Sequence, residues 1–152
     1  LVSQAVALPP LFAALRADYA PEAARRGIDL ALHSAIGQVE GDPQMLEIVL
    51  RNLVGNALRY CPAGSRVEVE ALRHAGRDRI AVRDDGPGVD AASRARLTER
   101  FFRVLGQEEG GSGLGLSIVQ RIADLHGVTL AFGPGLGGRG LGVTLDWPAP
   151  GS

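Results

Sequence analysis

Residues 42–60, with the sequence DPQMLEIVLRNLVGNALRY, decide the fold. Asp42 followed by Pro43 is typical of a helix start, because the aspartate can accept from free backbone N–H groups and proline suits the first turn. One buried face is indicated by apolar residues at helical spacing; they are Leu46, Val49, Leu50, Leu53 and Ala57. The stretch predicts a helix over residues 44–60 that ends at Cys61-Pro62.

Upstream of this helix, the sequence predicts one more helix and a short strand. Residues 11–26 have helical spacing, with a kink expected at Pro21 and an end at Gly27, and residues 28–32 alternate apolar and polar side chains. We expect residues 1–8 to be a frayed end that Pro9-Pro10 terminates.

Downstream, the pattern predicts two pairs of strands separated by helices. Residues 66–72 and 79–82 read as strands joined by an Ala75-Gly76 turn. The further expected elements are a short polar helix over 90–98, a helix over 114–126 ended by Gly127, and strands over 128–132 and 141–147 joined by a glycine-rich loop at 133–140. Strands in hairpins, with helices that do not strictly alternate, favour an α+β two-layer α/β sandwich. We expect a mixed, mostly antiparallel sheet with helices on one face.

Composition excludes several classes of function. The 152 residues and 15.9 kDa fit one domain, and 45% hydrophobic with 22% charged residues argues against a disordered chain. A formal net charge of -1 gives no reason to expect nucleic acid or an anionic membrane as partner. Cys61 is the only cysteine, which excludes a disulfide framework and a thiolate zinc cluster. All 16 basic residues are arginine, which excludes a P-loop, because that motif needs a lysine.

The first candidate site is a polar edge of the helix over 44–60. Asn52, Asn56 and Tyr60 are spaced four apart and therefore share this edge. Amide oxygens can help to hold Mg²⁺ together with substrate phosphates, and Arg59 could reach a phosphate. Taken alone, the motif fits better with asparagines that bond backbone or water at a helix border.

Two glycine-rich motifs are the other candidates. Residues 84–88 (DDGPG) follow a predicted strand and could present a carboxylate to the amine of adenine, although an ordinary Asp-Gly turn has the same composition. Residues 110–116 (GGSGLGL) lead into a helix, where free backbone N–H groups suit phosphate, although a flexible loop with a helix cap is the alternative. This run is not the dinucleotide fingerprint, because Leu116 stands where the third glycine would be.

Together, the order and spacing of four motifs closely resemble the ATP-binding catalytic domain of bacterial sensor histidine kinases. This family belongs to a superfamily with DNA gyrase, the ninety-kilodalton heat-shock chaperone and MutL. Residues 52–60 (NLVGNALRY) look like the N box of the family, and residues 84–88 look like its G1 box. Residues 100–103 (RFFR) look like the F box, and residues 111–117 (GSGLGLS) look like the G2 box. The resemblance covers residues from about 11 to 147.

The resemblance implies a binding site for ATP and Mg²⁺. Asn56 would hold the metal with Asn52 close by, Arg59 would contact phosphate, and Tyr60 would flank the adenine. Asp84 would accept from the adenine amine. The family pattern also places Arg103 toward the γ-phosphate. It assigns further nucleotide contacts to Gly86, Gly88, Phe101, Gly111, Gly113, Leu114, Gly115 and Leu116. The segment 103–113 would be the lid over the triphosphate.

The resemblance also implies partners that lie outside this sequence. In the family, phosphate passes to a histidine on a dimerising helical hairpin, and from there to the receiver domain of a response regulator. His33, His74 and His126 lack the sequence context of that acceptor and are expected to be structural or solvated. We therefore expect residues 1–10 to be a linker remnant, 11–148 a catalytic domain and 149–152 a tail. This domain would be monomeric and cytoplasmic, within a parent protein of the bacterial inner membrane.

Three other functions remain open at this point. The same pocket could serve a hydrolytic ATPase, an anti-sigma-factor serine kinase or a docking module without activity. In hydrolytic relatives a glutamate base stands four residues before the metal-binding asparagine, and Asn52 occupies that position here. An amide cannot accept a proton near neutral pH, and Glu47 lies off the Asn52–Asn56 edge, so the sequence favours transfer over hydrolysis.

Overall fold

A five-stranded sheet forms one layer of the molecule. The computed structural model describes residues 1–97 and 115–150. In spatial order, the strands are β2 (Asp29–Ser34), β4 (Arg66–His74), β5 (Arg77–Asp84), β7 (Leu141–Asp146) and β6 (Thr129–Pro134). Only the β2–β4 pair is parallel, while β4–β5, β5–β7 and β6–β7 are antiparallel. The mixed, mostly antiparallel sheet is therefore confirmed.

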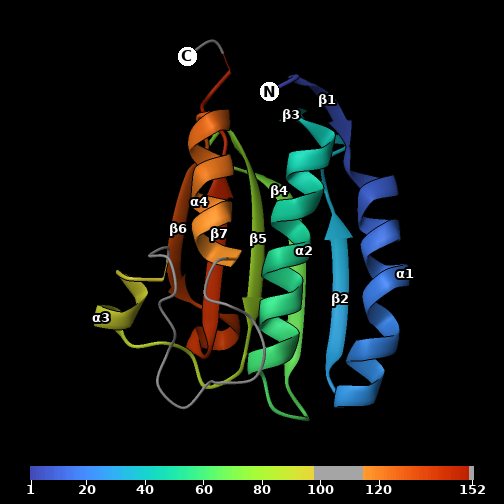
Figure 1. Ribbon diagram of the computed structural model, residues 1–152, viewed down its shortest axis with the longest axis vertical. Helices are drawn as coiled ribbons and strands as arrows, with labels where there is room; N and C mark the ends of the chain where they lie inside the picture. Colours follow the sequence, from blue (N-terminus) through green and yellow to red (C-terminus); the bar gives the residue numbers. More distant parts are fainter. Residues whose placement is uncertain (98–114, 151–152) are drawn as a thin grey trace.

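Three helices form the second layer, as Figure 1 shows. They are α1 (Leu8–Arg26), α2 (Pro43–Tyr60) and α4 (Gly115–His126), and α2 lies between the other two. The buried face of α2 is the one predicted; it contains Leu46, Val49, Leu50, Leu53 and Ala57, with Val54 and Leu58 beside them. The α+β two-layer sandwich with helices on one face is confirmed, and α2 is its central helix.

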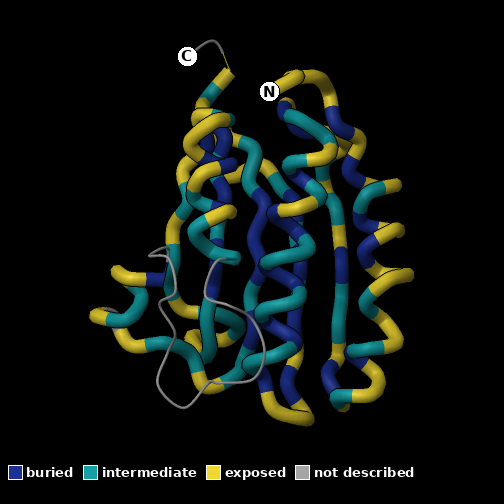
Figure 2. The backbone as a smooth tube through the Cα atoms, in the orientation of Figure 1, coloured by how far each residue is buried: buried dark blue, intermediate teal, exposed yellow. Residues whose placement is uncertain are grey.

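Alternating burial along β4 shows why the sheet holds the helices on one face (Figure 2). Val67, Val69 and Ala71 are buried, whereas Glu68 and Glu70 between them are half-buried. Successive side chains of a strand point to opposite faces, so the valines pack under the helices and the glutamates do not. Each fully buried valine contributes about 1.5–3 kcal/mol to stability.

The start of α2 is fixed by an aspartate and a histidine. Asp42 Oδ1 accepts from Gln44 N at 3.0 Å and from Met45 N at 3.2 Å, as expected for an N-cap. His126, at the end of α4, accepts from Asp42 N through Nε2 at 3.0 Å, and its Nδ1 lies 2.8 Å from Ile122 O. His126 therefore has the structural role expected of it, and it joins α4 to the start of α2.

The prediction for residues 1–8 was wrong. Gln4–Ala7 is a strand, β1, which pairs antiparallel with β3 (Gln38–Gly41), a second strand that the sequence pattern did not predict. Helix α1 begins at Leu8, so Pro9-Pro10 lies in its first turn instead of ending a segment. Proline is tolerated there because first-turn N–H groups have no partner within the helix.

The remaining differences concern the length of elements. Helix α1 continues through Pro21 as one element. Helix α3 (Ala91–Arg94) is shorter than the predicted 90–98, and a short 3₁₀ turn, Leu136–Gly138, interrupts the predicted loop at 133–140. Near the chain's C-terminus, Trp147 Nε1 donates to Glu40 O at 2.7 Å and joins the end of β7 to β3. None of the helices in the described residues is long and apolar enough to span a membrane.

Candidate functional site

The amide edge of α2 lies against the first residue of α4. A Cβ atom on Gly115 would lie 2.8 Å from Asn52 Oδ1 and 3.8 Å from Asn56 Nδ2. Real Cβ contacts essentially never reach 2.8 Å, so a larger residue at 115 would require the Asn52 side chain to move. The fold thus brings the predicted N box and the last part of the predicted G2 box together, and the positive end of the α4 dipole faces Asn52.

Both asparagines have hydrogen bonds within the chain. Asn52 Nδ2 donates to Ile48 O at 2.9 Å, and Asn56 Oδ1 accepts from Arg59 Nη2 at 2.5 Å. The alternative that the asparagines bond the backbone therefore holds for the side-chain amino group of Asn52. The side-chain carbonyl oxygen of Asn52 faces Gly115 instead. The contact between Arg59 and Asn56 places a guanidinium beside the amide predicted to hold the metal.

The second part of the site is a carboxylate at the end of β5. Asp84 is only 8% exposed, and its Oδ1 accepts from Gly86 N at 2.9 Å and from Leu141 N at 3.2 Å. Burial raises the pKa of this carboxyl group, and the two backbone N–H bonds partly oppose the increase. Asp84 is thus held rigidly at a strand end, as the sequence predicted.

Glycines let the loop between β6 and β7 close over Asp84. Gly140 has φ +69°, and a Cβ there would overlap the Asp84 backbone oxygen and Oδ1. Gly88, with φ +75°, lies so near Gly140 that its Cβ would be 2.9 Å from Gly140 O. Beside them opens a groove lined by residues 86–90 and 138–140 together with Arg94 and Pro134. Sequence reasoning treated 133–140 as a connecting loop, although its density of glycines was a signal for close packing.

The position of Cys61 beside the Asp84 loop was also missed. Cys61 follows α2 directly and is buried, and a Cβ on Gly86 would lie 2.9 Å from its Sγ. The sequence pattern marked Cys61 only as the end of a helix.

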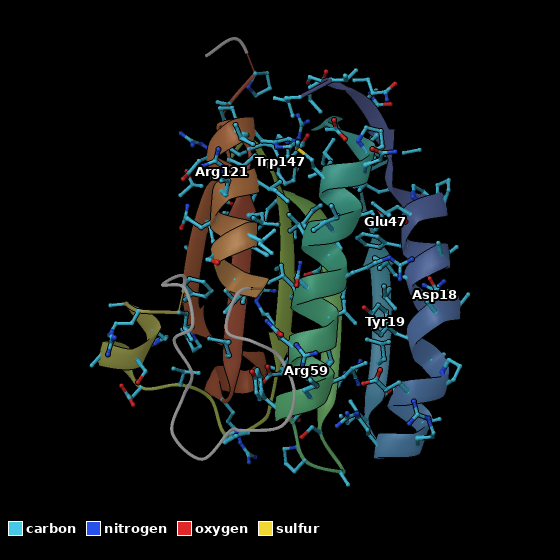
Figure 3. All side chains as sticks on the ribbon, in the orientation of Figure 1. Asp18, Tyr19, Glu47, Arg59, Arg121 and Trp147 are labelled. Carbon is cyan, nitrogen blue, oxygen red and sulfur yellow. The ribbon has the colours of Figure 1, made fainter. Side chains whose placement is uncertain are left out.

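Glu47 is directed away from the amide edge. It pairs with Arg51 at 3.7 Å, and Arg51 also pairs with Asp18 of α1 at 2.5 Å. Figure 3 shows Glu47 on the part of α2 beside α1, whereas Arg59 lies near the opposite end of α2. The expectation that Glu47 lies off the Asn52–Asn56 edge is therefore confirmed.

Several predicted site residues lie outside the described residues. They are Phe101, Arg103, Gly111, Gly113 and Leu114, together with the whole of the predicted lid, 103–113. Of the described ones, Tyr60 is half-buried in the last turn of α2, and Leu116 packs partly buried against the core. Asn52, Asn56, Arg59 and Gly115 form one cluster, and Asp84, Gly86 and Gly88 form another.

Known proteins are similar to this chain in sequence and in fold. Residues 41–151 match the family described as histidine kinase-, DNA gyrase B- and HSP90-like ATPase. The chain belongs to this ATPase family. Sensor protein kinase PmrB of Pseudomonas aeruginosa is 42% identical over 92% of this chain and 30% of its own length. A solved structure of a mycobacterial sensor histidine kinase, MprB, superposes with a TM-score of 0.81 at 27% identity, covering 95% of this chain and 97% of that one.

A second solved structure contains bound AMPPNP. Full-length ShkA in complex with AMPPNP superposes with a TM-score of 0.83 at 31% identity, covering 97% of this chain and 31% of ShkA. Within this ATPase family, the chain is therefore a catalytic, ATP-binding domain of the sensor histidine kinase type. It spans about a third of the length of PmrB.

Proposed function

We propose that the chain binds MgATP between Asp84 and the Asn52–Asn56 edge, and transfers the γ-phosphoryl group to a histidine on a separate helical hairpin. The observation that carries the proposal is the pairing of a buried carboxylate at the end of β5 with an amide edge beside the start of α4. The first suits an adenine amine and the second suits phosphates. The AMPPNP complex of ShkA supports a nucleotide in a site of this fold.

The adenine would bind at the Asp84 end. Its amine would donate to the Asp84 carboxylate, while Gly86 and Gly88 contribute no side chain to the adjoining groove. A buried acceptor matched to a donor rejects a base that lacks the donor, because the carboxylate is then left unpaired. Tyr60, one residue before Cys61, would flank the ring.

The phosphates would bind near Asn52, Asn56 and Arg59. The described residues contain no cluster of three or more His, Cys, Asp or Glu side chains that could hold a metal ion. The two amide oxygens are neutral, hard ligands that fit Mg²⁺ only in company with charged phosphate oxygens. When bound, the metal would neutralise phosphate charge, and Arg59 would exchange Asn56 Oδ1 for a phosphate oxygen.

The chain's own residues favour transfer over hydrolysis. Asn52 cannot accept a proton from water, and Glu47 is paired with Arg51 on the other side of α2. The site therefore positions ATP without activating water near it. We further propose a receiver domain as the next acceptor, and a membrane-bound parent protein with this domain on its cytoplasmic side.

A binding assay beside two activity assays tests the proposal. The 152-residue chain should bind MgATP, hydrolyse it very slowly and fail to label itself from radioactive ATP. Label should pass to a hairpin domain of the parent protein when that domain is supplied separately. Brisk ATP turnover by the chain alone, lost in Asn56→Ala, would favour the hydrolytic alternative. Absence of metal-dependent ATP binding would favour a docking module.

A further inference from the structure

A second groove, of about 570 Å³, lies between α1 and α2. Figure 3 shows Tyr19 on its α1 side and Arg59 on its α2 side. The two helices are joined along the groove, because Tyr19 Oη donates to Arg51 O at 3.1 Å. Its charged lining consists of a single glutamate and four arginines, which are Arg25, Arg26, Arg51 and Arg59.

The arginines of this groove are only partly compensated. Carboxylates of α1 pair with Arg26 at 3.0 Å and with Arg51 at 2.5 Å. Arg25 and Arg59 have no carboxylate partner within the part of the chain that the structure describes. Arg59 bonds the neutral amide of Asn56, and its Nε is buried without a hydrogen-bond partner in that same part of the chain. The groove therefore keeps positive charge that an acidic partner would neutralise.

The shape of the groove fits a helix better than a small anion. Its α2 side runs from Ile48 to Arg59, which is roughly 16 Å, or about three helical turns, at the rise of an α-helix. Ile48 is 45% exposed and offers an apolar contact at the end of this side away from Arg59. A small anion needs neither this length nor an apolar contact, whereas an acidic helix with some apolar residues uses both.

The groove is continuous with the candidate phosphate site. Asn52 and Arg59 line the groove, and the same two side chains belong to the cluster that would bind the phosphates of ATP. A partner that lies in the groove is therefore brought against the phosphate end of the nucleotide. Of the partners proposed above, the hairpin is the one that takes phosphate directly from ATP, so it is the one that must reach this point.

We propose that the groove between α1 and α2 docks the phosphate-accepting hairpin, through an acidic helical stretch of that hairpin that also contacts Ile48. This inference rests on the proposed transfer to a hairpin histidine, and it adds the face of the domain at which the hairpin binds. Arg25 pairs with a carboxylate of the hairpin, while Arg59 remains with the phosphates.

Two substitutions at exposed positions of the groove test the docking site without changing the nucleotide cluster. Arg25→Glu reverses an uncompensated charge, and Ile48→Ser removes the apolar contact. In a titration with the separately made hairpin domain of the parent protein and MgAMPPNP, each substitution should weaken binding on the order of fivefold, as expected for a charge at the rim of an interface or a partly buried side chain. The affinity for ATP should stay within about twofold, because both positions lie at the surface.

Matched controls come from α4, which α2 separates from α1 (Figure 1). Arg121, labelled on α4 in Figure 3, is exposed, and Leu125 is 47% exposed, close to the value for Ile48. Arg121→Glu and Leu125→Ser should leave hairpin binding unchanged. Higher ionic strength should weaken binding by the parent chain more than binding by Arg25→Glu, because salt screens the attraction that this variant has lost.

The outcomes separate the docking site from the proposed function. Unchanged hairpin binding in both groove variants would overturn the docking site, and so would an equal loss in the two α4 controls. A fall in ATP affinity in Arg25→Glu would assign the groove to the nucleotide instead, and self-association of the chain that Arg25→Glu abolishes would assign it to a second copy. A hairpin that binds through the groove but gains no label from radioactive ATP would support the docking site and refute the proposed transfer.

Discussion

Burial makes the charged form of Asp84 unfavourable in the free domain. Its carboxyl group is buried, and burial raises its pKa because the charged form is the one that loses hydration. The backbone N–H groups of Gly86 and Leu141 compensate for only part of this cost. A group with such a cost in the free protein is typical of a site that acts on a ligand.

We expect Asp84→Asn to separate binding from stability. A carboxyl group with a raised folded-state pKa makes the fold lose stability as the pH rises from about 3.8 through that raised value. The asparagine variant lacks this loss, so it should unfold at pH 7 at the same temperature as the parent or higher, while its affinity for ATP falls severely. Thermal unfolding from pH 4 to 7 and a binding titration measure both. A variant that unfolds earlier and binds ATP normally would contradict the argument.

The identity of residue 52 should govern hydrolysis. Asn52 Oδ1 faces the start of α4, so Asn52→Glu would place a carboxylate beside the predicted phosphate site. General base catalysis contributes about 10²–10⁴-fold, and we expect steady-state ATP hydrolysis to rise by roughly the lower of these factors. Glu47→Gln is the control and should change nothing, because Glu47 pairs with Arg51. Lower hydrolysis in Glu47→Gln would mean that this glutamate acts on water.

Among the contacts between elements, the one made by His126 should have the clearest effect on stability when it is removed. It accepts the Asp42 N–H at the start of α2, and a Cβ on Gly41 would lie 2.8 Å from its ring. His126→Ala leaves that N–H without its acceptor and should lower the free energy of unfolding by about 1–3 kcal/mol, measured by urea denaturation. His74→Ala, at an exposed position, should have little effect. Equal effects of the two substitutions would refute this role.

The ion pair between β5 and β7 should make the stability of the domain depend on pH. Arg79 bonds Asp146 with both Nε, at 2.6 Å, and Nη2, at 3.0 Å, and this contact lowers the pKa of Asp146. The stabilisation is present above about pH 3.8 and is lost as the pH falls through the lowered pKa. Asp146→Asn should therefore be less stable than the parent at pH 7, and the two should converge in strong acid. Urea unfolding at both pH values measures the difference, and a constant gap would contradict the assignment.

Elements with strong local signals could be predicted from the sequence. Helix α2 has a cap, a proline and an apolar face within one stretch, and the β4–β5 hairpin has alternation and a turn. Strands β1 and β3 have four residues each and are defined by pairing across the sequence, as in Val6 with Val39. A period of two cannot be recognised over so short a run, so they were missed.

Within the site too, local features could be predicted from the sequence, whereas contacts between distant segments could not. Asn52 and Asn56 share a helix, so helical spacing predicted their shared edge. Asp84 could be recognised from its own loop. Its contacts with Cys61 and Leu141 depend on how distant segments meet, and no local pattern contains that information.

For the molecule as a whole, we expect metal binding to require nucleotide. The described residues offer no carboxylate or imidazole cluster for a metal, so Mg²⁺ should bind with the phosphates of ATP. Mg²⁺ alone should leave the thermal unfolding temperature unchanged, whereas Mg²⁺ with ATP should raise it beyond the effect of ATP alone, because ligands that bind the folded state stabilise it. Stabilisation by Mg²⁺ without nucleotide would reveal a different metal site.

Trp147 is an intrinsic fluorescence probe of this domain. It is the single tryptophan of the chain, it is buried, and it bonds a carbonyl 107 residues away in sequence. Its emission therefore depends on a contact that forms only when β7 and β3 have met. Fluorescence at this one position can follow the folding of both ends of the chain, at a distance from any nucleotide bound near Asp84.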